Sequence, residues 1–106
     1  MFPIYSPDDH LPNFQKVSAR LFRGGQPTAT GFAQLKEMGV GTVINLRDEA
    51  RLIEDERKVL QGLNLEYLSI PLSPFRAPKE AEINVFLEAV LGRKMPCFVH
   101  CWHGMD

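Results

Sequence analysis

Four short runs of apolar and β-branched residues, separated by longer stretches of helical periodicity, constrain the fold of this chain more than any other feature. They lie at residues 17–22, 41–46, 65–70 and 97–100. Glycine, proline or charged residues border these runs, and the run at 41–46 has the composition of a strand buried on both faces. The alternation predicts an α/β domain with a mostly parallel central sheet, flanking helices and right-handed crossovers.

Three amphipathic stretches are predicted to form the helices between these strands. Thr28 or Thr30 is expected to cap the first helix, and Gly39 to end it. The second is predicted over residues 50–63, with its charged residues on a solvated face. The third is expected to start near Pro78. Its predicted apolar face consists of Ile83, Phe86, Leu87, Val90 and Leu91.

The length and composition indicate one globular domain. At 106 residues, the chain is too short for two cores. Residues 1–12 are predicted to be an irregular lead-in, and residues 13–106 the N-terminal part of a single domain. The net charge of −1 and the lack of a like-charge block predict no nucleic-acid partner, and the lack of an apolar run of about 20 residues predicts no membrane insertion. The oligomeric state is left open.

The two cysteines are predicted to be free thiols. In a strand, Cys97 and Cys101 lie roughly 13 Å apart at about 3.3 Å per residue, which is too far for a disulfide bond. Free thiols are typical of a reducing compartment, so we expect a cytoplasmic location. Cys97 is expected to be a core residue.

The segments that follow the predicted strands are expected to gather at one edge of the sheet, where α/β proteins bind ligands. They are residues 23–27, 47–49, 71–77 and 101 onward. The last of them places Cys101 directly after a buried strand. The backbone amides of such a loop can bind a phosphate group, and they lower the pKa of a cysteine thiol. A thiolate held there can attack phosphorus.

The final residues, Val99-His100-Cys101-Trp102-His103-Gly104-Met105-Asp106, resemble the active-site motif of the protein tyrosine phosphatase superfamily, in its small dual-specificity-like branch. That motif is His-Cys, five variable residues and then Arg. Further similarity lies in Asn13-Phe14, in Leu21-Phe22-Arg23-Gly24-Gly25-Gln26-Pro27 and in Val43-Ile44-Asn45-Leu46-Arg47. The resemblance implies the phosphatase fold and the hydrolysis of phosphate monoesters, with a phosphorylated protein or a small phosphate ester as substrate.

The resemblance also implies the roles of individual residues. Cys101 would be the nucleophile that forms a phosphocysteine, and His100 would hold the loop and help to stabilise the thiolate. Asp106 would protonate the leaving oxygen, with Asp48 as the alternative acid. Arg23 and Arg47 are further candidates to face the phosphate. The backbone amides that would bind its oxygens belong to Trp102, His103, Gly104, Met105 and Asp106.

We expect no cofactor, and we expect no metal because His100, Cys101 and His103 cannot close a tetrahedral site from one strand end. The motif arginine would follow Asp106, where the sequence stops. The 106-residue chain is therefore expected to be a truncated, inactive form that lacks the C-terminal helices of the domain. Its strand residues Val43, Ile44 and Val99 are then expected to be partly exposed.

Two other functions are considered beside the phosphatase. One is a non-catalytic pseudophosphatase or fragment that binds phosphate weakly. The other is a sulfurtransferase of the rhodanese type, which also places a cysteine in an anion-binding loop after a parallel strand.

Overall fold

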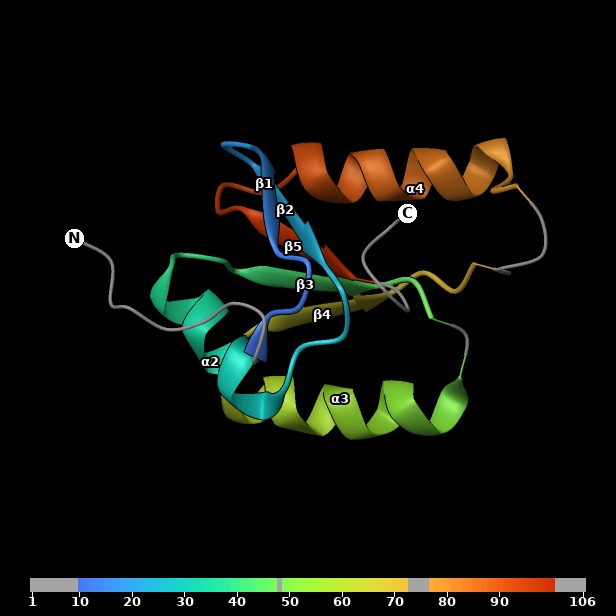
Figure 1. The fold of residues 1–106 in the computed structure, drawn as a ribbon. Helices are drawn as coiled ribbons and strands as arrows, with labels where there is room; N and C mark the ends of the chain where they lie inside the picture. The colour runs from blue at the N-terminus through green and yellow to red at the C-terminus, as the bar shows by residue number, and fades with distance from the viewer. Residues whose placement is uncertain (1–9, 48, 73–76, 101–106) are drawn as a thin grey trace.

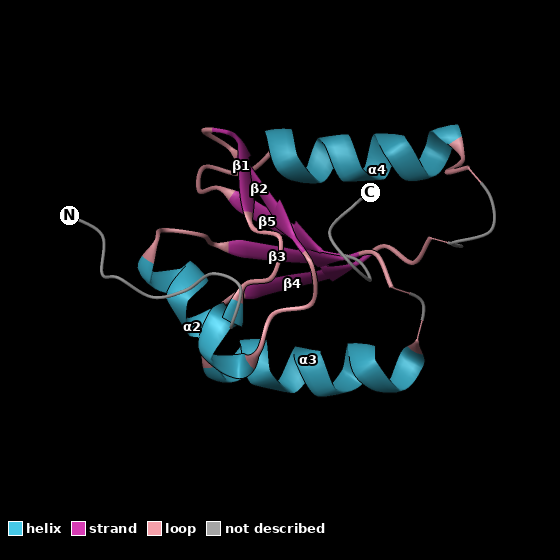
Figure 2. Ribbon diagram, in the orientation of Figure 1, coloured by secondary structure: helices cyan, strands magenta, loops and turns pink. Residues whose placement is uncertain are grey.

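A five-stranded sheet forms the centre of the molecule, with helices on both faces (Figure 1). The computed structural model describes residues 10–47, 49–72 and 77–100. In chain order the elements are β1 (Gln15–Ser18), β2 (Leu21–Gly24), α2 (Ala29–Glu37), β3 (Thr42–Asn45), α3 (Ala50–Gly62), β4 (Glu66–Ser69), α4 (Glu80–Leu91) and β5 (Cys97–His100) (Figure 2). The predicted alternation of strands and helices is confirmed from β2 to β5.

The strand order in the sheet is β1-β2-β5-β3-β4. Among the described strands, β2, β5, β3 and β4 run parallel to one another, and β1 pairs antiparallel with β2. The α/β class and the mostly parallel sheet are therefore confirmed. Because β5 lies between β2 and β3, its last residue, His100, is in register with Gly24 on one side and Asn45 on the other.

The prediction of one strand over residues 17–22 is wrong, because this segment contains the turn of a β-hairpin. β1 ends at Ser18 and β2 begins at Leu21. The Ser18 hydroxyl accepts a hydrogen bond from the backbone N–H of Arg20 at 3.1 Å, a local bond that favours a turn over a continuous strand. The extra strand β1 is exposed along its whole length and forms one edge of the sheet.

The two faces of the sheet bury separate apolar cores. On one face, Phe98 and Val43 pack with residues of α2 and α3. On the other, Ile44 and Val99 pack with Ala89 and Val90 of α4. Figure 1 shows α4 on the face opposite to α2 and α3. The expectation that Val43, Ile44 and Val99 are partly exposed is therefore wrong: their exposed fractions are 0%, 0% and 9%.

Four of the eight large apolar side chains that are exposed among the described residues lie on α4. Ala89 and Val90 of this helix are buried, and Phe86 packs against them. The prediction of one buried face is therefore only half right. Large apolar side chains on α4 that stay exposed are Ile83, Val85, Leu87 and Leu91. A helix that lies on a flat sheet buries only the stripe that faces the sheet, so its flanks remain in solvent.

Helix α2 begins as predicted. Its N-cap is Thr28, whose hydroxyl accepts a hydrogen bond from the backbone N–H of Gly31 at 3.1 Å. The preceding segment packs on the same helix: the Thr28 backbone N–H donates to the carbonyl of His10, and Leu11 is buried in the core. Within the described ranges no helix is long and apolar enough to cross a membrane.

Candidate active site

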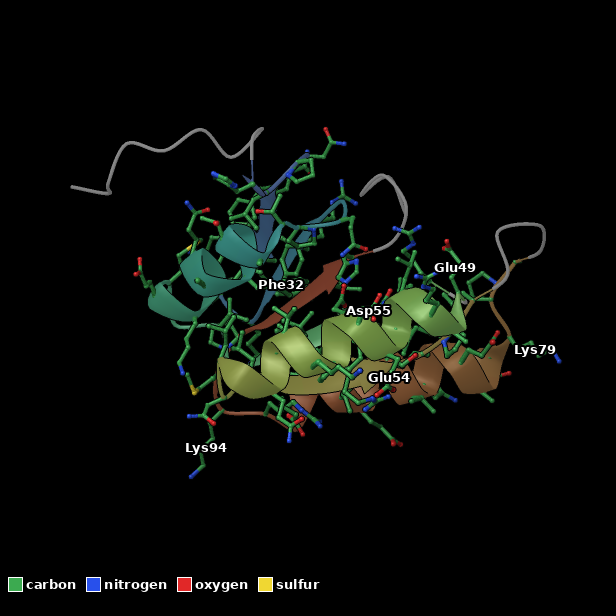
Figure 3. The ribbon with its side chains drawn as sticks, turned by 90° about the horizontal axis from the view of Figure 1, so that it is seen from below. Phe32, Glu49, Glu54, Asp55, Lys79 and Lys94 are labelled. Atoms are coloured by element: carbon green, nitrogen blue, oxygen red, sulfur yellow. The ribbon has the colours of Figure 1, made fainter. Side chains whose placement is uncertain are left out.

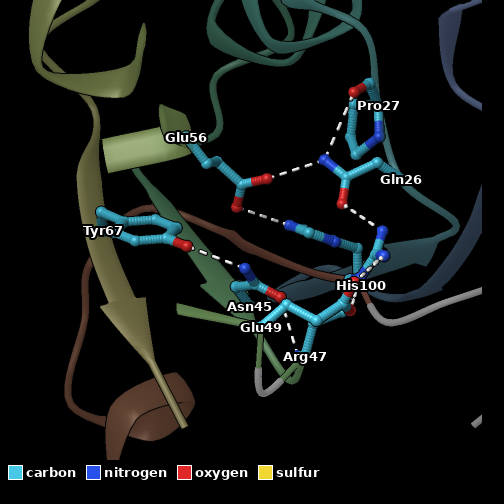
Figure 4. Close-up of polar contacts among 8 residues, drawn as sticks. All are labelled: Gln26, Pro27, Asn45, Arg47, Glu49, Glu56, Tyr67 and His100. Carbon is cyan, nitrogen blue, oxygen red and sulfur yellow. Dashed lines mark hydrogen bonds and ion pairs between the residues drawn. The ribbon is translucent and has the colours of Figure 1, made fainter. Parts of the chain in front are cut away.

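The polar side chains of the candidate site lie at and beyond the carboxyl ends of the parallel strands, where ligands bind in α/β sheets. His100 ends β5, Asn45 ends β3, and Gln26 follows β2. Figure 4 shows that these residues belong to one connected set of polar contacts. The predicted residues Asp48 and Cys101 to Asp106 lie outside the described residues.

His100 is buried and held on several sides. Its exposed fraction is 1%, and its Nε2 atom lies 2.7 Å from Oε2 of Glu56 on α3. The ring of Phe98 stacks on the imidazole, and the ring of Phe32 meets it edge-on, each at a centroid distance of 6.1 Å. Figure 3 shows Phe32 beside β5 on this face of the sheet. Among the described residues, the buried Nδ1 atom has no hydrogen-bond partner.

Glu56 connects His100 to the loop after β2. Its second carboxylate oxygen, Oε1, accepts a hydrogen bond from Gln26 Nε2 at 2.7 Å. Gln26 Oε1 in turn accepts from Nη1 of Arg47 at 3.1 Å. With an exposed fraction of 6%, Glu56 is a buried carboxylate, and both of its oxygens have hydrogen-bond partners.

Arg47 lies in this set, as the position after a predicted strand suggested. Its guanidinium forms a two-bond ion pair with Glu49, with Nε–Oε1 at 2.8 Å and Nη2–Oε2 at 3.0 Å. Its backbone N–H also donates to Oδ1 of Asn45 at 2.8 Å. The planar fork of Arg47 is thus engaged by a carboxylate of the same loop. A contact between Arg47 and phosphate stays a prediction.

Asn45 and Tyr67 extend the polar set to β4. Asn45 is fully buried, and its Nδ2 donates to the phenol oxygen of Tyr67 at 2.8 Å. Burial raises the pKa of the Tyr67 phenol far above its ordinary value; the Glu56 carboxylate raises it further, against the opposing effect of the Asn45 hydrogen bond. Tyr67 therefore stays neutral at physiological pH.

Arg23 does not join this set. It is in register with Val99, and since side chains alternate along a strand it extends to the α4 face, opposite to His100. Its Nε and Nη2 atoms donate to Gln15 Oε1 across the β-hairpin, at 2.9 and 2.6 Å. Cys97 is a buried free thiol of the α4 face, and burial raises its pKa, which fits the predicted core role.

Glu56 was not predicted as a site residue, because the charged residues of its helix were expected to lie on a solvated face. A signal was nevertheless present: Ile53, Leu60 and Leu63 fall with position 56 on one stripe at spacings of three and four residues. Those four positions are the ones that are not exposed over residues 51–63. A glutamate on an apolar stripe predicts a buried carboxylate with a specific partner.

Two cavities border the carboxyl ends of the strands. One, of about 220 Å³, lies beside the polar set and is lined by Gln26, Pro27, Ala29, Phe32, Arg47, Leu52, Asp55, Glu56 and Val59. The other, of about 180 Å³, lies under α4 and is lined almost entirely by apolar side chains. Within the described part of the chain, no three His, Cys, Asp or Glu side chains come together as they do in a metal site.

The arrangement can fix an imidazole directly before the predicted nucleophile. His100 is held by a carboxylate at one ring nitrogen and by aromatic rings at its sides, and it is the residue before Cys101. A buried, oriented histidine at the carboxyl end of a central strand is a feature on which an anion-binding loop can be built.

A protein family and a curated protein match this chain over nearly its whole length. Residues 5–106 match the protein family described as a DSP-PTPase phosphatase fused to NAD+ kinase. Among curated proteins, the chain is 27% identical over 115 residues to Probable NAD kinase 2, chloroplastic, of Oryza sativa subsp. japonica. That match covers 99% of this chain but only 11% of the rice protein.

Solved structures of phosphatases share the fold. A DUF442 phosphatase of Shewanella putrefaciens CN-32 superimposes with a TM-score of 0.79 at 27% identity, over 97% of this chain and 68% of that one. P. aeruginosa TpbA gives a TM-score of 0.74 at 27% identity, over 95% and 58% of the two chains. A Cys-to-Ser variant of TpbA, solved in complex with pTyr, gives 0.75 at 25% identity, over 98% and 60%.

These matches confirm the resemblance to the protein tyrosine phosphatase superfamily and its fold, and they favour the phosphatase over the rhodanese-type alternative. The chain belongs to the family of dual-specificity-type protein tyrosine phosphatase domains fused to NAD+ kinase.

Proposed function

We propose that the chain carries the nucleophile of a cysteine-dependent phosphatase that hydrolyses phosphate monoesters. The observation that carries the proposal is the position of His100, buried at the carboxyl end of the central strand β5, with Cys101 as the next residue. The family match across residues 5–106 supports the same assignment.

In the proposed mechanism, the Cys101 thiolate attacks phosphorus, the bond between phosphorus and the leaving oxygen breaks, and Asp106 gives that oxygen a proton. The resulting phosphocysteine is then hydrolysed by water, which releases inorganic phosphate and the free thiolate. The backbone amides from Trp102 to Asp106 bind the phosphate oxygens through both steps. Asp48 is the alternative acid.

The proposed substrates are phosphorylated proteins or small phosphate esters. The complex of the TpbA variant with pTyr supports a phosphotyrosine-like phosphate monoester as the first compound to test. The family description and the rice relative support a second proposal, that these residues act beside an NAD kinase domain. A cytoplasmic location stays a prediction.

The test is hydrolysis of an aryl phosphate by a polypeptide in which the motif arginine and the C-terminal helices of the family domain follow residue 106, called the full chain below, with Cys101→Ser and Asp106→Asn as variants. The serine variant is expected to lose turnover, and full activity in it would overturn the role of Cys101. The asparagine variant is expected to lose most activity toward esters with poor leaving groups and little toward good ones. An unchanged dependence on the leaving group would transfer the acid role to Asp48.

A matched experiment uses the 106-residue polypeptide alone. We propose that it does not turn over, because phosphoryl transfer relies on a guanidinium that clamps the phosphate oxygens and the motif arginine is absent from these residues. Weak binding of inorganic phosphate without hydrolysis would support the non-catalytic alternative for this polypeptide. Hydrolysis at the rate of the full chain would show that the arginine is dispensable.

A further inference from the structure

The hydrogen bonds around His100 have a defined direction. A guanidinium can only donate, so the Gln26 atom that lies 3.1 Å from Arg47 Nη1 must be the amide oxygen. The amide nitrogen of Gln26 is then the atom that faces Glu56, and it donates to Oε1 at 2.7 Å. Arg47 therefore sets the orientation of the Gln26 amide, and the amide nitrogen of Gln26 donates to the Glu56 carboxylate.

The contact with Glu56 also determines which ring nitrogen of His100 carries a proton. An ionised carboxylate has no proton to give, so the 2.7 Å contact between Glu56 Oε2 and His100 Nε2 requires a proton on Nε2. His100 Nδ1 is buried and has no partner within the described residues. The ring plane is held by Phe32 and Phe98. Orientation and tautomer of the ring are both set by neighbouring side chains.

We propose that Glu56 is a positioning residue of the phosphatase site: it holds His100, the residue before Cys101, in the form protonated at Nε2. This proposal rests on the proposed function, and it assigns to a residue of α3 a role that acts through His100. A carboxylate that accepts from one ring nitrogen fixes the orientation and the tautomer of the imidazole. An imidazole fixed directly before Cys101 in the sequence can help to stabilise the thiolate.

The surroundings make a purely stabilising role a poor explanation. Burial of a carboxylate and an imidazole costs desolvation energy that their attraction does not reliably return. Among the described residues, Arg47 lies nearby through its bond to Gln26 and is paired with Glu49, while Asp55 lines the same cavity as Glu56 and Tyr67 stays neutral. Of these groups, Glu56 is the one whose carboxylate contacts the His100 imidazole.

The first measurement is made on the unmodified full chain, and it needs no turnover. The ¹⁵N chemical shifts of the His100 imidazole distinguish a protonated ring nitrogen from a bare one. We expect Nε2 to carry a proton at every pH at which the protein is folded. A ring protonated at Nδ1 with a bare Nε2 would overturn the proposal, since Glu56 would then be the donor.

The second measurement compares Glu56→Gln with Glu54→Gln. Glu54 lies on the face of α3 turned away from the sheet (Figure 3), its side chain is 60% exposed, and it pairs only with Arg57 among the described residues. The readout is the rate of alkylation of Cys101 by iodoacetamide as a function of pH, with the labelled cysteine identified by mass spectrometry. The buried Cys97 serves as an internal unreactive thiol.

In Glu56→Gln we expect a higher Cys101 pKa and a loss of about tenfold in the alkylation rate at pH 6, the factor that one pKa unit produces. The kcat for aryl phosphate should fall while KM stays unchanged. Glu54→Gln should match the unmodified protein. An unchanged pH profile in a folded Glu56→Gln variant would overturn the proposal. If the unmodified full chain shows no hydrolysis while the ¹⁵N shifts and the alkylation rates respond as expected, the proposed function fails and the positioning role of Glu56 stands.

Discussion

The two ends of the central strands carry polar clusters of opposite character. β3 and β4 begin with Thr42 and Glu66, where the Glu66 carboxylate accepts from Thr42 and forms a two-bond ion pair with Arg93. The side chains of Glu66 and Arg93 are 49% and 28% exposed. At the other end, His100 and Glu56 form their contact with side chains that are 0% and 4% exposed.

The exposed Glu66–Arg93 pair loses little solvation free energy on folding, whereas the buried Glu56–His100 pair loses much more. An exposed ion pair is worth about 0–1 kcal/mol, so the amino-end cluster neither costs nor contributes much. The buried set at the carboxyl end must satisfy each polar atom or lose stability. This buried polar set lies at the carboxyl ends of the strands, and Cys101 follows directly after the last residue of β5 in the sequence.

The largest expected effect comes from removal of the buried carboxylate. Glu56→Ala leaves His100 Nε2 and the Gln26 amide without their acceptor, and loss of one partner of a buried pair costs about 3–5 kcal/mol. Urea unfolding followed by circular dichroism measures the change. The matched variant at the other end, Glu66→Ala, should lose less than about 1 kcal/mol. Equal losses in the two variants would remove the distinction between the two ends.

A pair of glycines tests how tightly the segment at His10 packs on the first turn of α2. A Cβ on Gly31 would clash with the His10 carbonyl oxygen, so Gly31→Ala should cost about 1–3 kcal/mol through backbone displacement. Gly62 ends α3, just before the strand that starts with Glu66, and nothing lies within 4 Å of its Cβ position. Gly62→Ala should raise the unfolding free energy by about 0.5 kcal/mol. Thermal unfolding of both variants is the measurement. A Gly31→Ala protein as stable as the unmodified one would show that the segment at His10 can move away from α2.

Tyr67→Phe tests the branch of the buried set that reaches β4. The ring remains, but the Asn45 amide loses its acceptor, which should cost about 1 kcal/mol. The raised pKa of Tyr67 also sets a pH dependence. The folded state keeps the phenol proton where the unfolded chain releases it, so the unfolding free energy should fall above pH about 10. Unfolding curves from pH 8 to 11 should show a smaller decline in the phenylalanine variant. The same decline in both proteins would assign it to other groups.

The sequence predicted much of the fold because local pattern and tertiary role agree in the buried strands. β3 and β5 are buried on both faces, so a short β-branched run has one consistent interpretation. The hairpin was missed because the bond from Arg20 to Ser18 interrupts a stretch whose composition suits a strand throughout.

At the site, His100 was indicated by the resemblance to the phosphatase motif, and Arg47 by its position directly after a predicted strand. Arg23 follows the same rule but lies on the opposite face, since facing depends on the pairing register. Glu56 could be predicted as a site residue only by knowing that α3 packs on the face of the sheet that carries His100. Its carboxylate and the imidazole are 44 residues apart in the sequence, and no local pattern joins them.

The smallest expected effect is the pH dependence of the amino-end ion pair. The hydrogen bond from Arg93 lowers the pKa of Glu66 below the ordinary 4.5, with a further contribution from Thr42. Because the folded-state pKa is depressed, the stabilisation is fully present above about pH 4.5 and is lost as the pH falls through the lower folded-state value. The side chain is half exposed, so solvent screens the pair and its whole contribution should stay below about 1 kcal/mol. Glu66→Gln should therefore lower the unfolding free energy slightly at pH 7 and by progressively less as the pH falls below about 4.5, and 1 M salt should reduce the difference at pH 7. A larger loss at pH 7 that resists salt would mean that this pair behaves as a buried one, and the contrast between the two ends of the sheet would then rest on the residues around His100 alone.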